Sequence, residues 1–119
     1  MISIDKAKRL KELGLKWNPK LGDWYKADCW PTPTLFTIDT LKLDDKEIEC
    51  LIEKVKENTW LPSLDQMLDM FNSNWELYRT YDGNSYVFEY RIRGVWYISK
   101  GNSKEDVVAD ALINLLECK

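Results

Sequence analysis

Three residues of this chain have the types and spacing of a protein-binding surface. Tyr78, Arg91 and Trp96 lie in a region, residues 74–99, where alternating residues predict β-strands. Successive side chains of a strand point to opposite faces, so the alternation places all three on one face. The other predicted members of that face are Glu76, Thr80, Val87, Glu89 and Ile98. Because Tyr, Trp and Arg are enriched among the residues that dominate binding energy, we predict a partner contact patch at Tyr78, Arg91 and Trp96.

A second hypothesis uses different chemistry. Arginine binds phosphate through paired hydrogen bonds, and an indole ring stacks on a nucleobase. A pocket for a small nucleotide would then use Trp24 for the base and Arg79, Arg91 or Arg93 for the phosphate.

The chain contains no histidine, which excludes Ser-His-Asp and Cys-His catalysis, histidine bases and histidine-containing zinc sites. Cys29, Cys50 and Cys118 are odd in number and widely spaced, which favours reduced thiols over disulfides or a zinc site. An enzyme would have to use carboxylates, lysines, tyrosines or thiols, in a deep pocket with strongly shifted pKa values. We therefore predict a non-enzymatic protein without catalytic residues, cofactor or metal.

Two clusters of charge have simpler explanations than a site. An acidic group of four carboxylates could form a metal or acid–base site, but helix capping explains Asp44, Asp45 and Glu47. A basic group could contact phosphate, but a solvated helix face explains it more easily. The acidic group is Asp39, Asp44, Asp45 and Glu47, and the basic group is Lys6, Lys8, Arg9, Lys11, Lys16 and Lys20. The net charge of −3 and pI near 5.0 argue against general affinity for nucleic acid.

The elements that must position these residues predict an α+β fold in a single domain, residues 1–119. Within residues 1–60 we expect a helix over 3–13, short strands near 15–17, 23–27 and 34–38, and a helix from Asp44 to about Asn58. The segment 15–28 is expected to form a hairpin that brings Trp17 close to Trp24.

Residues 61–119 predict the order α-β-β-β-α. Ser63 caps the first helix of this half, turns at 82–84 and 93–94 separate three antiparallel strands, and Ser103 caps a last helix with a wide apolar stripe. That stripe should cover one face of the small sheet. The opposite face carries the predicted patch, and the sequence leaves open what covers it. The alternatives are the aromatic N-terminal segment, a partner, ordinary solvent, or a second copy in a homodimer.

The chain begins MISIDKAKRL, without an apolar signal region, and no apolar run approaches the length that spans a membrane. We therefore expect a soluble protein of the cytoplasm with no membrane partner.

The α-β-β-β-α order and the ending SKGNSKEDVVADALINLL resemble double-stranded RNA-binding domains over residues 63–117. That resemblance implies phosphate contacts from lysines at the start of the last helix. Only Lys104 matches these lysines, and Glu105 and Asp106 follow it.

The phrases WNPKLGDWY, TWLPSLDQMLDMF and SKEDVVADALINLLECK resemble small uncharacterised proteins of phages and prophages of low-GC Gram-positive bacteria. This resemblance implies an accessory protein in the host cytoplasm. Some such proteins bind and block host defence components, and others sequester nucleotide signals. The expected function is therefore a binding module, as an inhibitor of a host defence protein or as a binder of a small nucleotide.

Overall fold

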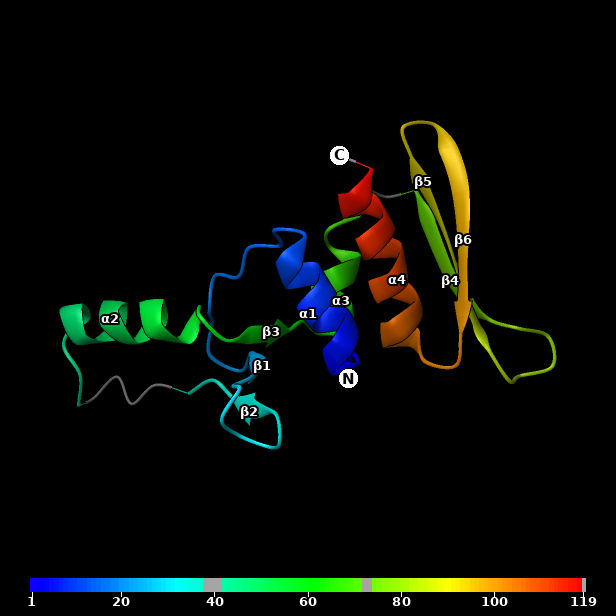
Figure 1. Cartoon of the computed structure of the whole chain (residues 1–119). Helices are drawn as coiled ribbons and strands as arrows, with labels where there is room; N and C mark the ends of the chain where they lie inside the picture. Colours follow the sequence, from blue (N-terminus) through cyan, green and yellow to red (C-terminus); the bar gives the residue numbers. More distant parts are fainter. Residues whose placement is uncertain (38–41, 72–73, 119) are drawn as a thin grey trace.

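The computed structural model describes residues 1–37, 42–71 and 74–118, which form four helices and two three-stranded antiparallel sheets. The predicted α+β class is therefore confirmed. The helices are α1 (Ile4–Glu12), α2 (Asp45–Val55), α3 (Leu64–Leu68) and α4 (Lys104–Glu117). The strands are β1 (Trp24–Lys26), β2 (Thr34–Leu35), β3 (Thr59–Leu61), β4 (Trp75–Arg79), β5 (Tyr86–Ile92) and β6 (Val95–Gly101) (Figure 1).

The C-terminal sheet has the order β4-β5-β6 and the register that the alternation predicts. Phe88 lies opposite Leu77 and Tyr90 lies opposite Tyr97, so their side chains share the inner face. A two-residue turn joins β5 to β6, with Arg93 at φ 50° and Gly94 at φ 84°. Both turn residues have positive φ, which suits the twist of a tight hairpin. Alternation along residues 74–81 would place Tyr81 on the face of Trp75 and Leu77, but Tyr81 follows β4 in the loop and is fully exposed.

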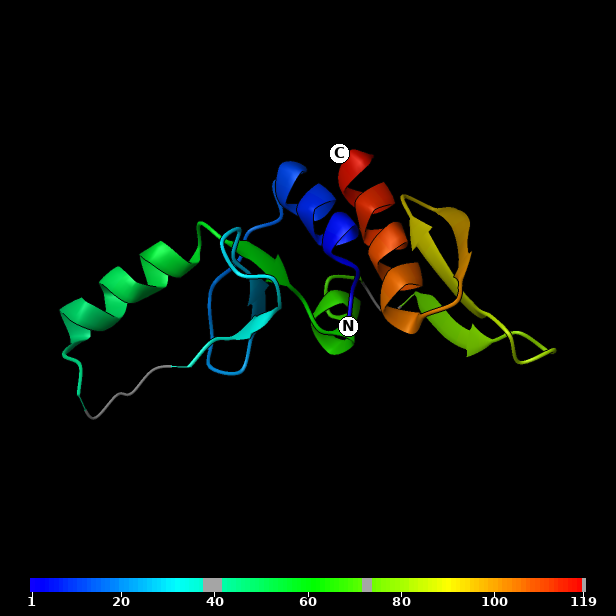
Figure 2. The ribbon, with the colours of Figure 1, turned by 60° about the horizontal axis from the view of Figure 1, so that its bottom comes forward.

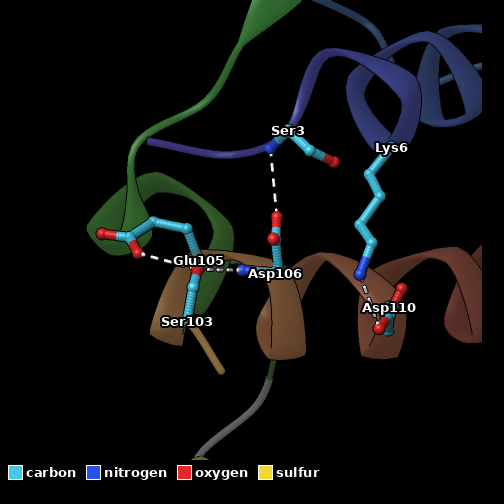
Figure 3. Close-up of polar contacts among 6 residues, drawn as sticks. All are labelled: Ser3, Lys6, Ser103, Glu105, Asp106 and Asp110. Atoms are coloured by element: carbon cyan, nitrogen blue, oxygen red, sulfur yellow. Dashed lines mark hydrogen bonds and ion pairs between the residues drawn. The ribbon is translucent and has the colours of Figure 1, made fainter. Parts of the chain in front are cut away.

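Helices cover only the inner face of this sheet. The apolar stripe of α4 buries Val107, Val108, Ala111 and Leu112 against β5 and β6. Helix α1 lies on the side of α4 away from the sheet, and the two helices run parallel (Figure 1). The Ser3 amide donates to Asp106 at 3.0 Å and Lys6 pairs with Asp110 at 2.8 Å, which fixes this register (Figure 3).

The aromatic N-terminal segment forms a second sheet, β2-β1-β3, instead of covering the first. No strand forms at 15–17, so the predicted hairpin of Trp17 and Trp24 is wrong. Trp17 is buried against Tyr25, Phe36 and Trp60 in a core of its own, because β3 supplies the pairing partner for β1. Ile38, at the end of the third predicted strand, lies outside the described residues.

Helix α2 projects away from the rest of the molecule (Figures 1 and 2). With this helix included, the molecule measures 51 × 30 × 24 Å along its principal axes. Asp44 caps it as predicted, by accepting from the Glu47 amide at 2.8 Å. The helix ends at Val55, three residues before the expected Asn58. Within α2 Val55 is buried, and the other apolar residues of its stripe, Ile48, Leu51 and Ile52, are half-buried, with Ile52 packed against the N-terminal core.

Candidate binding surface

The face of the C-terminal sheet opposite the helices is open. We call it the outer face, and its members are Glu76, Tyr78, Val87, Glu89, Arg91, Trp96, Ile98 and Lys100. Trp96 is 56% exposed and Ile98 is 69% exposed, and the two are next neighbours on the same side of the edge strand β6. Tyr78 on β4 is 43% exposed. Of the alternatives for this face, cover by the N-terminal segment is therefore excluded. The side of the sheet away from α4 carries no other element of the described chain (Figure 1).

The structure brings two of the three predicted patch residues, Arg91 and Trp96, together, but Tyr78 lies apart from them. Arg91 and Trp96 lie directly opposite each other on β5 and β6, so their side chains are immediate neighbours. Tyr78 lies opposite Val87, which is 8% exposed, at the far end of the same face. The Arg91 end is therefore the compact part of the patch, and Ile98 joins it.

Arg91 has hydrogen-bond donors that the described chain leaves unused. Among the described residues, its guanidinium makes no hydrogen bond or ion pair. Glu89, by contrast, accepts a hydrogen bond of 3.0 Å from the Tyr78 hydroxyl. A cation with unused donors beside an exposed indole can bind a carboxylate from outside the chain by donating hydrogen bonds to it.

The hydrogen bond to Glu89 raises the pKa of Tyr78 above its ordinary value of 10.0, with further contributions from desolvation and from the charges of Glu89 and Glu76. The hydroxyl must keep its proton to donate, and the nearby negative charges disfavour a phenolate. Its contribution to stability is therefore complete below the unfolded pKa and is lost as the pH rises through the folded pKa.

We expect Glu89→Ala to lower the pKa of Tyr78 more than Glu76→Ala does, because Glu89 supplies both the hydrogen-bond acceptor and the larger of the two charge effects. Titration of the Tyr78 ring by nuclear magnetic resonance from neutral to alkaline pH measures both shifts. Equal effects of the two substitutions would contradict the hydrogen bond as the main cause.

Of the four residues of the nucleotide hypothesis, Arg91 lies on the outer face, and the other three lie in three separate places. Arg79 stands at one end of the sheet, where it donates to the Tyr86 hydroxyl at 2.8 Å and lies over its ring. Arg93 stands in the turn at the other end of β5, roughly 20 Å away at the rise of an extended strand. Trp24 belongs to the other sheet and is 39% exposed. These residues do not form one pocket.

The remaining candidates are equally dispersed. Lys104 extends over the Tyr86 ring with Nζ 5.5 Å from its centre. Cys29 and Cys50 are exposed and Cys118 is half-buried. Asp39 lies outside the described residues. Within the described ranges, no group of three or more Cys, Asp or Glu is placed to hold a metal ion.

Groups with shifted pKa values do not converge either. A hydrogen bond from the Thr80 hydroxyl lowers the pKa of Asp82 in the β4–β5 loop. Burial raises the pKa of Tyr90, whose hydroxyl accepts from Asn114 on the inner face. Tyr78 lies on the opposite face from Tyr90, so these groups have no common pocket.

No protein-family model, curated protein or solved structure matches this chain. Of the helices in the described ranges of the chain, none is both long enough and apolar enough to cross a membrane.

Proposed function

We propose that this chain is a non-enzymatic binding protein that docks a partner protein on its outer face. The observation that carries the proposal is the exposure of Trp96 and Ile98 beside Arg91, which has no ion-pair or hydrogen-bond partner in the part of the chain that the structure describes. Large apolar side chains gathered on one uncovered sheet face favour an interaction surface, because burial of such area drives association.

The chemistry of this end of the face specifies the partner. Trp96 and Ile98 fit an apolar surface, and the guanidinium of Arg91 fits a carboxylate beside it. We propose a partner protein that presents an acidic residue at the edge of an apolar patch. The pair of an aromatic anchor and an adjacent arginine is the composition that concentrates binding energy.

The biological setting belongs to the same proposal. The resemblance of WNPKLGDWY and TWLPSLDQMLDMF to phage and prophage proteins supports an accessory protein of a phage or mobile element. The partner would then be a protein in the cytoplasm of a Gram-positive host, and a component of host defence is the class that this resemblance favours.

The test compares three immobilised proteins: the wild type, Trp96→Ala with Arg91→Ala, and Trp30→Ala. Trp30 is 63% exposed and lies in the N-terminal half, so Trp30→Ala removes a similar ring from a different surface. Each protein is incubated with a lysate of a low-GC Gram-positive bacterium, and a captured protein is then purified and its affinity measured. We expect the outer-face variant to lose at least about 2 kcal/mol of binding free energy, and Trp30→Ala to lose little.

Two outcomes would overturn this proposal. One is a partner that binds all three proteins equally, because the outer face would then be irrelevant to binding. The other is a wild-type dimer that the outer-face variant converts to a monomer, as seen by light scattering. In that case a second copy of this chain occupies the face. Circular dichroism of each variant verifies that the fold is intact.

A further inference from the structure

A hollow lies far from the outer face, between α1, the end of α2 and the N-terminal aromatic core. Its volume is about 290 Å³. Apolar lining comes from Ala7 and Leu15 and from the rings of Trp17 and Trp60, which stack with an interplanar angle of 4°. The polar residues of the lining are Asn18, Asn58, Lys11, Lys16 and Lys56, whose side chains end in amide or ammonium groups. The hollow is therefore half apolar and half cationic.

The three lysines come from different segments of the chain. Lys11 is in the last turn of α1, Lys16 follows that helix, and Lys56 is the C-cap of α2. No carboxylate side chain of the described residues lines the hollow with them. Three ammonium groups around one small volume repel each other, so an anion placed among them is stabilised.

Each ammonium group has capacity for a ligand. Lys16 makes no hydrogen bond or ion pair within the described ranges. Lys11 donates to the backbone carbonyl of Glu57 at 2.6 Å, which leaves two further N–H donors. Lys56 pairs with Glu53 at 3.1 Å, but Glu53 is 72% exposed, and such a surface pair contributes little.

Two helix C-termini beside the hollow disfavour a bound anion, because each carries a partial negative charge. The C-termini of α1 and α2 each carry a partial charge of about −0.5. Together these approach one negative charge, and Glu53 beside Lys56 adds a second, against three ammonium groups. The local balance therefore stays positive, although the whole chain has a net charge of −3.

We infer that this hollow binds a small phosphate-bearing molecule with a flat or apolar body, of the size of a nucleoside monophosphate. The lysines hold the phosphate, as compact cations do in many phosphate sites. The apolar lining of Leu15 and Trp60 receives the body of the ligand, and the amides of Asn18 and Asn58 supply donors and acceptors. The volume is at the lower limit of ordinary ligand sites, which favours one phosphate and one ring system over anything larger.

The test is titration of the full chain with the four common ribonucleoside monophosphates, followed by calorimetry and by tryptophan fluorescence. We expect at least one of them to bind below about 1 mM, and its affinity to fall as salt is added. Inorganic phosphate and the unphosphorylated nucleoside are each expected to bind at least about tenfold more weakly, since each lacks half of the recognised chemistry.

Matched charge reversals locate the site. Lys16→Glu is expected to weaken binding by at least about tenfold. Lys8→Glu changes the net charge equally, but Lys8 is exposed on α1 outside the hollow, so its effect should be under about twofold. Circular dichroism verifies both folds.

Three results would overturn the inference. They are no binding of any monophosphate at about 1 mM, equal weakening by the two reversals, and a nucleoside or inorganic phosphate that binds as tightly as the nucleotide. Failure here leaves the outer-face proposal unaffected, because the two surfaces share no residue.

Discussion

Replacing Phe88 by alanine is expected to remove about 4 kcal/mol from the free energy of unfolding. Phe88 is fully buried in the central strand β5. Its ring contacts Phe71 at 5.1 Å, Tyr90 at 5.4 Å and Trp75 at 5.8 Å between centroids. Truncation removes the buried ring and leaves a cavity where the sheet, α3 and α4 meet, which the surrounding side chains cannot fill without moving.

Urea unfolding followed by far-ultraviolet circular dichroism measures this loss. Tyr81→Ala is the matched control, because it removes an aromatic ring from a fully exposed position after β4. That control should change the free energy of unfolding by less than about 0.5 kcal/mol. A loss below about 1 kcal/mol for Phe88→Ala would contradict the packing of the helices on the inner face.

Asp23→Ala is expected to cost about 3 kcal/mol of folding free energy, although Asp23 is a polar residue in a loop. Asp23 is only 6% exposed, and its carboxylate accepts three hydrogen bonds. The donors are the Trp17 indole at 2.9 Å, the Lys20 amide at 3.0 Å and the Gln66 side chain at 2.7 Å. Removing the acceptor leaves buried or half-buried donors without a partner, and each such group costs about 1–3 kcal/mol.

Gln66 connects Asp23 to α3, so the loss of the Asp23 carboxylate should also affect the start of that helix. Its side-chain oxygen accepts from the Ser63 amide at 2.8 Å in the capping box of α3, while its nitrogen donates to Asp23. Asp23 therefore joins the small sheet to the start of α3. Asp28→Ala is the control, because Asp28 is exposed, and denaturation monitored by tryptophan fluorescence compares the two. Equal stability of the two variants would contradict this role of Asp23.

The C-terminal half could be predicted in detail because its signals are local. The alternation of residues 86–92, the glycines at 83 and 94 and the Ser103 cap each act within a few residues, and the structure confirms all of them. The position of Arg91 opposite Trp96 then follows from the length of one turn. The predicted patch is thus a consequence of strand register.

The N-terminal half was predicted less well because its contacts are distant in sequence. Strand β3 (Thr59–Leu61) has no alternation of its own and forms only by pairing with β1, more than 30 residues earlier. Without β3 in the prediction, Trp17 was given Trp24 as a neighbour, whereas Trp60 stacks on it. The cationic hollow could not be predicted for the same reason. Lys56 lies near Lys11 and Lys16 only because β3 pairs with β1 and so positions the end of α2.

Whether the outer face would be covered also depended on the whole fold. The aromatic residues of the segment 17–36 are apolar enough to cover a sheet, and only the existence of a separate partner sheet directs them elsewhere. Burial of Trp17 and Phe36 in their own core holds this segment away from Trp96 and Ile98.

Hydroxyl-radical footprinting of the purified chain, alone and with a captured partner, tests the central claim most directly. In the isolated chain we expect Trp96 to be oxidised about as fast as Trp30, because their exposed fractions are 56% and 63%. With the partner bound, Trp96 should become protected while Trp30 stays reactive. Slow oxidation of Trp96 in an isolated monomer, or a complex that protects Trp30 and leaves Trp96 reactive, would contradict an open outer face that docks a partner protein.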